Sequence, residues 1–97
     1  MEGNVNALII KSIDTVAVAV NTLNEGDLAV YLVNGEERQT RVVQDIPIYH
    51  KFSLVDIQKG DPVIKYGENI GTASKDIHIG EHVHTHNVTS NREQIQR

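Results

Sequence analysis

The chain has 97 residues, nine basic against thirteen acidic side chains, a formal net charge of −4 and no cysteine. Such a length makes one domain that buries about 60–65% of its unfolded surface, which leaves little room for a complete active site. The composition excludes disulfides and thiolate-bound metals, and the acidic balance excludes the basic patch that a nucleic-acid backbone requires.

β-Branched residues dominate the chain: 23 residues are Val or Ile, whereas five are Leu and one is Met. Such side chains favour strands, because their stiff χ1 angles pack well on a pleated sheet. Runs of apolar residues predict strands at 7–11, 15–21, 28–33, 38–43, 63–66, 70–73 and 82–88. In the second of these, Val alternates with Ala, and the small Ala side chains predict a strand that is buried on both faces.

Asn34-Gly35 is the strongest turn signal in the chain. Both residues tolerate a positive φ, so they predict a tight hairpin between the third and fourth strands. Residues 50–57 are ambiguous, because the spacing of Phe52, Val55 and Ile57 suits one or two helical turns. The sequence therefore predicts a mainly β fold of short strands, with at most one short helix near residues 51–57.

A short pattern recurs along the chain. Residues 56–63 and 76–83 share an apolar residue, two further residues, a glycine, an acid and then a strand, and residues 22–29 show a weaker version. The glycine suits the left-handed backbone that ends a turn and directs the next strand. The pattern therefore predicts tight turns within a compact, folded-over β structure.

Histidines gather near the end of the chain, where four of the five lie between residues 78 and 86. His82, His84 and His86 alternate, and residues two apart in a strand point to the same face. Imidazoles without thiolates suit Fe(II), Mn, Zn or Ni, with Asn87 or a carboxylate as a further ligand. The alternative is that the three are ordinary exposed or hydrogen-bonded strand residues.

Two other features are candidates to join this site. His50-Lys51 follows the turn at Pro47, and Lys65-Tyr66 ends a strand. Lysine and tyrosine can hold a carboxylate or transfer a proton. Taken singly, each lysine is more simply a solvated surface charge, and Tyr66 a half-buried packing residue. No Gly-rich phosphate loop and no Gly-x-Ser-x-Gly motif accompanies them.

Three blocks together resemble a known family. They are Ile46-Pro47 with His50-Lys51-Phe52, then Val63 with Lys65-Tyr66-Gly67 and Ile70-Gly71, then Gly80-Glu81-His82-Val83-His84-Thr85-His86-Asn87-Val88. Their order and spacing resemble the N-terminal SAF-type domain of altronate and galactarate dehydratases. The resemblance implies a β-clip domain at residues 1–88, and the scarcity of large apolar residues in 89–97 predicts a flexible tail there.

The resemblance implies a lyase that removes water from a sugar acid and yields a 2-keto-3-deoxy product. A similar small subunit in sulfolactate sulfo-lyase would release sulfite instead. Both eliminations remove a proton α to a carboxylate, and the implied cofactor is a divalent metal, Fe(II) or Mn(II), that stabilises the enolate. The chain is then expected to be the small subunit, or the N-terminal domain, of a two-component enzyme, inactive without a large catalytic subunit.

Matching the blocks residue by residue assigns roles to the candidates. His84 and His86 are the catalytic candidates, and the same two residues with His82 are the candidate metal ligands. The candidate substrate-binding residues are His50, Lys51, Lys65, Tyr66 and Asn87. The alternatives are a non-catalytic module that binds a sugar acid and a pure assembly surface, and a homo-oligomer is left open.

The expected location follows from two further features of the sequence. No apolar run approaches the ~20 residues of a membrane span. The polar, acidic start at residues 1–4 is unlike the positively charged start of a signal peptide. A cytoplasmic protein without nucleic-acid or membrane partners is therefore expected.

Overall fold

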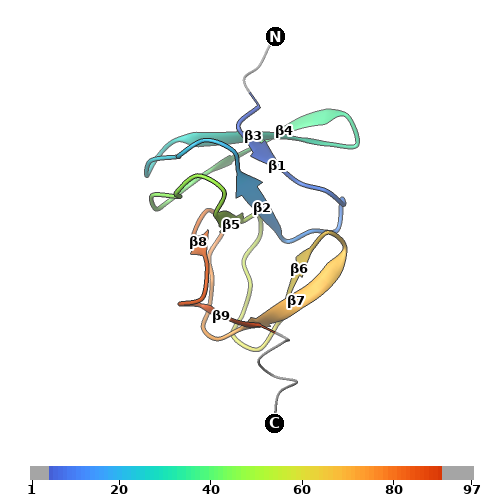
Figure 1. Cartoon of the computed structure of the whole chain (residues 1–97), viewed down its shortest axis with the longest axis vertical. Coiled ribbons are helices and arrows are strands. Elements are labelled where there is room, and N and C mark those ends of the chain that lie inside the picture. The colour runs from blue at the N-terminus through green and yellow to red at the C-terminus, as the bar shows by residue number, and fades with distance from the viewer. Residues whose placement is uncertain (1–4, 91–97) are drawn as a thin grey trace.

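The computed structural model describes residues 5–90, and within that range the chain forms nine strands and no helix (Figure 1). The strands are β1 (Ala7–Leu8), β2 (Val16–Ala19), β3 (Leu28–Val33), β4 (Glu36–Arg41), β5 (Lys51–Ser53), β6 (Pro62–Lys65), β7 (Glu68–Ala73), β8 (His82–Val83) and β9 (Val88–Ser90). The mainly β prediction is confirmed. In the same range there is no helix of the length and apolarity that crossing a membrane requires.

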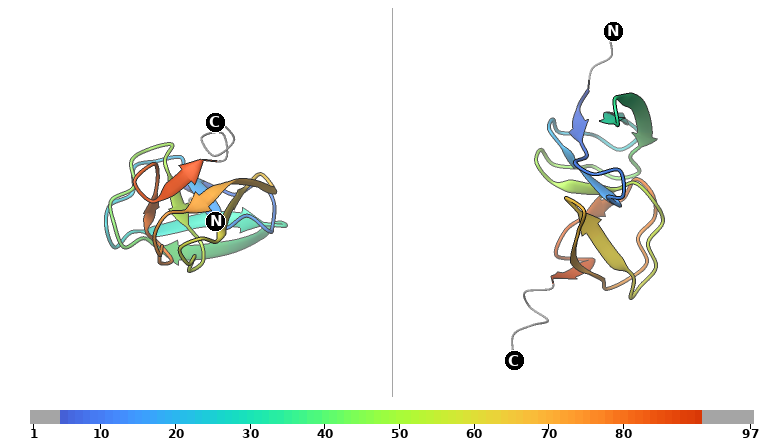
Figure 2. Two further views of the ribbon diagram at one scale, coloured as in Figure 1. Left: turned by 90° about the horizontal axis from the view of Figure 1, so that it is seen from below. Right: turned by 90° about the vertical axis from the view of Figure 1, so that its right-hand side faces the viewer.

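The strands form three antiparallel sheets. One has four strands in the order β1-β2-β5-β8, one is the β3-β4 hairpin, and one has three strands in the order β6-β7-β9. Figures 1 and 2 show the four-stranded sheet between the β3-β4 hairpin at one end and the β6-β7-β9 sheet at the other. The central sheet therefore has neighbours on both sides, and it also carries the candidate site.

β2 shows how the sequence builds a core on each side of the central sheet. Ala17 and Ala19 point into one hydrophobic cluster with Phe52. Val16, on the opposite face, points into a second cluster with Val83. Because successive side chains of a strand alternate between faces, the Val/Ala alternation supplies both cores at once. The prediction of a strand buried on both faces is confirmed.

Two hairpins turn on residues with left-handed backbone. Asn34-Gly35 joins β3 and β4 with φ values of 52° and 83°, which confirms the predicted hairpin. Tyr66-Gly67 joins β6 and β7 with φ values of 58° and 74°. A tyrosine rarely adopts this conformation, so the second turn places the Tyr66 side chain at some cost in strain.

Two sequence predictions need correction. Residues 82–88 do not form one strand, because β8 ends at Val83, residues 85–87 turn and β9 begins at Val88. The helical alternative for residues 50–57 is wrong, because Lys51 and Phe52 bond into the central sheet on both edges. β9 runs to Ser90, two residues into the predicted tail, and residues 91–97 lie outside the described range.

Four turns of one shape recur among the described residues, and we name each by its first residue: the Leu23, Ile46, Ile57 and Ile77 turns. Leu23 bridges Ile46, and Ile57 bridges Ile77, so the turns form two pairs. In every turn the backbone N–H of the fifth residue donates to the carbonyl of the second, at 2.8–3.0 Å. The sequence pattern predicted three of these turns. The structure shows that the turn at Pro47 has the same shape, although it lacks both the glycine and the acid.

Candidate functional site

Pairing of β5 with β8 brings together histidines that are distant in the sequence. Lys51 pairs with Val83 and Phe52 with His82, so the continued register places residue 84 opposite residue 50. The ring centroids of His50, His82 and His84 lie 4.6–5.6 Å apart, with planes within 23° of parallel. The His86 ring lies 5.3 Å from that of His82. We call these four residues the imidazole cluster.

The three alternating histidines thus lie together, as predicted, but not for the predicted reason. They do not share one strand face, because β8 ends at Val83. The turn that follows carries His84 and His86 back toward His82, and β5 adds His50. The sequence analysis placed His50 among the substrate contacts, which stays a prediction. The structure places its ring in the cluster, with its Nδ1 2.8 Å from Nε2 of His82.

Asn87 shapes the turn after β8. Its Oδ1 accepts the backbone N–H of His84 at 3.0 Å, and its Nδ2 donates to the carbonyl of His82 at 2.9 Å. The residue is 3% exposed. Because both ends of its side-chain amide bond within the turn, Asn87 holds the turn in place. Its role as a substrate contact stays a prediction.

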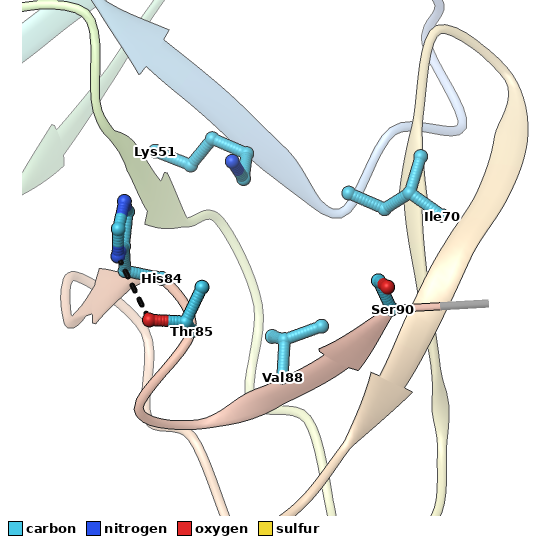
Figure 3. A pocket seen from close by; sticks show the side chains of 6 residues that line it. All are labelled: Lys51, Ile70, His84, Thr85, Val88 and Ser90. Carbon is cyan, nitrogen blue, oxygen red and sulfur yellow. Dashed lines mark hydrogen bonds between the residues drawn. The ribbon is translucent and has the colours of Figure 1, made fainter. Parts of the chain in front are cut away.

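A hollow of about 150 Å³ lies beside the cluster (Figure 3). Its polar lining comes from Lys51, His84, Thr85 and Ser90, and its apolar lining from Ile70 and Val88. Figure 3 shows Lys51 of β5 and Ile70 of β7 on one side, with His84, Thr85, Val88 and Ser90 on the other. The hollow therefore offers a cation, an imidazole and two hydroxyls within one small space.

Burial and neighbouring positive charges act on the ionisable groups of this region. Burial lowers the pKa of Lys51, and Lys65 lowers it further. Burial also lowers the pKa of His82 and of His84, and both pKa values fall further through His50, His86 and Lys51. A neutral imidazole is therefore the stable form of His82 and His84 at pH 7.

Lys65 and Tyr66, two further candidates, line a second hollow with Asp14 and the apolar side chains Leu8, Ile10, Val16 and Val18. The Lys65 ammonium lies 4.4 Å from the centroid of the Tyr66 ring, a cation–π contact. Lys65 acts electrostatically on Lys51, yet each lysine lines its own hollow. The structure therefore separates this pair from the imidazole cluster.

Asp14 holds together two of the segments that line the second hollow. Its Oδ1 accepts the backbone N–H of Gly67 at 2.7 Å, and its Oδ2 accepts those of Ile10 and Lys11 at 3.1–3.2 Å. Burial raises the pKa of this carboxyl, but hydrogen bonds from the backbone of Gly67, Lys11, Tyr66 and Ile10 lower it more, so the net pKa lies below its ordinary value. Asp14 therefore ties the loop after β1 to the β6-β7 turn as a carboxylate.

The predicted metal site has suitable donors but not a suitable arrangement. Imidazole nitrogens are good ligands for Fe(II) and Mn(II). However, His50 and His82 hydrogen-bond to each other, and stacked rings do not aim their nitrogens at one point. Within residues 5–90, no group of three or more His, Asp or Glu side chains is arranged to hold a metal ion. The metal therefore stays a prediction, and we derive no chemical step from it.

Sequence reasoning missed three residues that shape the two hollows. Thr85 lies between two singled-out histidines, so its hydroxyl could have been noted. Ser90 was assigned to the tail, and it lines the hollow because β9 continues past Val88. Asp14 carries no local signal, because its partners near Gly67 are 53 residues away.

Comparison with known proteins identifies the family. The model of the altronate/galactarate dehydratase SAF domain matches residues 5–91, which is most of the chain. The chain belongs to this SAF-domain family. The resemblance carried by the three sequence blocks is confirmed, and the SAF domain accounts for the all-strand architecture of residues 5–90.

Two kinds of enzyme contain a region that is similar to this chain. Altronate dehydratase of Escherichia coli is 45% identical over 82 residues, which are 84% of this chain and 16% of that enzyme. Sulfolactate sulfo-lyase subunit alpha of Paracoccus pantotrophus is 52% identical over 48 residues, 50% of this chain and 72% of that subunit. The corresponding subunit of Chromohalobacter salexigens is 38% identical over 77 residues, 77% of this chain and 82% of that subunit. The chain thus spans about a sixth of the altronate dehydratases but most of the sulfo-lyase subunits.

Proposed function

We propose that this SAF domain forms one wall of the active site of a sugar-acid hydro-lyase, which a larger catalytic part completes. The observation that carries the proposal is the hollow that joins Lys51 to the imidazole cluster, in a chain similar to altronate dehydratases. A cation and hydroxyls in one small, partly apolar space suit a polyhydroxylated acid. The open, incomplete lining of this wall supports a site that needs a second component.

In this proposal Lys51 binds the carboxylate of the substrate. Its side chain is partly buried and reaches the hollow from β5. A lysine–carboxylate hydrogen bond is charge-assisted, and exclusion of water by the catalytic part would strengthen it further. Thr85 and Ser90 line the same hollow, and we propose that they bond hydroxyls of the same molecule; the Thr85 Oγ1 also lies 3.3 Å from Nδ1 of His84 (Figure 3).

His84 is the proposed general base. Elimination requires a base that takes the proton from the carbon next to the carboxylate. His84 lines the hollow, and its lowered pKa leaves a neutral imidazole at pH 7. The electron pair of the broken C–H bond forms the enol double bond while the C–O bond on the neighbouring carbon breaks. The departing hydroxide takes a proton, which the protonated His84 or a group of the catalytic part would supply, and leaves as water.

His86 has a smaller part in this proposal. It does not line the hollow, and it joins the cluster through His82. Its predicted catalytic role therefore depends on groups outside residues 5–90. For the divalent metal, this chain would supply His86 as a ligand, because His84 is the proposed base, and the remaining ligands would come from the catalytic part.

A sulfo-lyase is the second candidate. The observation that supports it is similarity, because the sulfolactate sulfo-lyase alpha subunits are 52% and 38% identical to this chain over 48 and 77 residues. The chemistry at the carbon next to the carboxylate is the same, and only the leaving group differs. In that case the hollow would face a sulfonate as well as a carboxylate, and both anions suit Lys51.

The test combines the chain with the large catalytic component and measures elimination from altronate, galactarate and sulfolactate. We expect activity only when both components are present, with the released water or sulfite assigning the class. Full activity of the catalytic component alone would contradict the proposal. A non-catalytic carbohydrate-acid module would instead bind these acids without changing the rate, which NMR titration of the chain would show.

A further inference from the structure

The Ile46 turn departs from its three sister turns at the position of the acid. In those turns the fifth residue accepts a hydrogen bond from the backbone N–H of the second. The bonds are Asn24 N to Asp27 Oδ2 at 2.8 Å, Gln58 N to Asp61 Oδ2 at 3.2 Å and His78 N to Glu81 Oε1 at 2.9 Å. The Ile46 turn has His50 at the fifth position.

Pro47 explains why the acid is dispensable in the Ile46 turn. Proline occupies the second position there, and proline has no backbone N–H. The side chain at position 50 therefore has no donor to satisfy within the turn. The backbone bond common to all four turns is still present, from His50 N to the carbonyl of Pro47 at 3.0 Å.

Tyr49 is a second departure of the Ile46 turn from the other three turns. Its φ is 70°, close to the 88–94° of the glycines at this position in the sister turns. A tyrosine in this region is strained, and its side chain is 72% exposed, so packing of that side chain does not explain its presence. The Ile46 turn thus keeps the backbone shape of its sisters while it has lost both structural residues.

We propose that His50 is a positioning residue that aligns the imidazoles of His82 and His84, and that Pro47 frees it for this role. The hydrogen bond between His50 Nδ1 and His82 Nε2 couples the tautomers of the two rings. The stack on His84, with planes 9° apart, fixes the ring that lines the hollow. The catalytic consequence of this alignment rests on the proposed function.

His50 can affect the lining of the hollow in two ways. His50 touches His84 directly, and the next residue along β5 is Lys51, whose side chain lines the hollow with His84. A change at position 50 is therefore expected to move His84 without removing any hydrogen bond that the turn needs. In the other three turns a change at the fifth position would remove a hydrogen bond of the turn itself, because the side chain there accepts the backbone N–H of the second residue.

The test uses two variants of the full chain and one matched control. The single variant is His50→Asn. The triple variant Pro47→Asn, Tyr49→Gly, His50→Asp gives the Ile46 turn the residues of the Leu23 turn at these positions, so it is expected to fold even if the single variant does not. The control Asp61→Asn changes the fifth position of a sister turn.

The first readout is the ¹⁵N spectrum of the imidazoles in the free chain. We expect new His82 and His84 ring shifts, which report tautomer and stacking, in both variants, and unchanged shifts in the control. Unchanged His82 and His84 shifts in a folded variant at position 50 would overturn the proposal, whatever the activity.

The second readout is the rate of the assembled enzyme. A misaligned base lowers kcat about ten- to a hundredfold and leaves KM nearly unchanged, because Lys51 still binds the substrate. Altered ring shifts with an unchanged kcat would uphold the positioning role and contradict the proposed function instead. The two proposals are thereby separated.

Discussion

The two pairs of turns share one design but differ in symmetry. In the Ile57–Ile77 pair, the aspartates that precede each turn bond reciprocally: Asp76 Oδ1 accepts Lys59 N and Asp56 Oδ1 accepts Ile79 N, both at 2.9 Å. In the Leu23–Ile46 pair, Asp45 Oδ1 accepts Glu25 N at 2.8 Å, and Thr22 stands where the second aspartate would be.

The difference indicates which residues of the repeat stabilise the turns and which residues no longer have that structural role. The symmetrical pair uses its acids and glycines for its own backbone. In the Leu23–Ile46 pair the departures gather at one side, at Thr22, Pro47, Tyr49 and His50, and His50 belongs to the imidazole cluster. Departure from an internal repeat thus points to the site, and the following predictions test this comparison.

The largest expected effect is at a glycine of the symmetrical pair. A Cβ on Gly80 would lie 2.5 Å from the carbonyl oxygen of Arg41, and its φ is 88°. Because both a backbone clash and left-handed strain result, Gly80→Ala should lower the free energy of unfolding by about 3 kcal/mol or more. Urea denaturation measures it. Tyr49→Ala at the equivalent position should change stability by less than about 0.5 kcal/mol, and equal losses in the two variants would contradict the comparison.

An exchange of residues between equivalent positions should have a smaller effect. Gly60 has a φ of 94° and open space around the site of its Cβ, so Gly60→Tyr adds strain without a clash and should cost about 1–2 kcal/mol. Tyr49→Gly removes the same strain, partly offset by a freer unfolded chain, and should gain about 1 kcal/mol or less. Thermal unfolding of the two variants checks that stability falls in Gly60→Tyr and rises in Tyr49→Gly. A loss of stability in both variants would show that the fold needs Tyr49.

Loss of a turn acid should be weaker still. Asp27→Ala removes the 2.8 Å bond to the backbone of Asn24 and should destabilise the domain by about 0.5–1.5 kcal/mol. His50→Asn removes no backbone bond of its turn and should cost less. Chemical denaturation of the two variants gives the difference, and a greater loss for His50→Asn would mean that His50 supports the fold first.

The smallest expected effect is a dependence of stability on pH. Burial and neighbouring positive groups lower the pKa of His82 and His84 in the folded chain, so the unfolded chain binds protons more readily below pH ~6.5. Stability should therefore decline as the pH falls below that value. Unfolding curves at pH 7.5 and 5.5 measure the decline, and His82→Gln should reduce it. An increase in stability on acidification would show that these histidines gain protons on folding.

The sequence predicted those features of the fold that depend on residues adjacent in the chain. Asn34-Gly35 gave the hairpin, and the Val/Ala alternation of β2 gave a strand buried on both faces, because each depends on adjacent residues. The end of β8 was missed, because it depends on the Asn87 amide bonding back to His84 and His82.

The composition of the site was harder to predict, since it depends on strand pairing. The sequence singled out His50, Lys51 and His84, but the register of β5 with β8 decides that they meet. Lys65 and Tyr66, at the end of β6 and in the turn to β7, line another hollow. The turn at Pro47 was not recognised as a member of the repeat, because Pro47, Tyr49 and His50 replace the residues by which the other three turns were found.

The most direct test of the central claim is the kinetics of Lys51→Met in the assembled enzyme, beside Lys75→Met as a control for charge at an exposed lysine. Loss of a charge-assisted bond to the substrate carboxylate should lower kcat/KM about ten- to a hundredfold, mostly through KM, and the control should match the wild type. An unchanged KM in Lys51→Met would contradict the claim that this hollow binds the substrate acid.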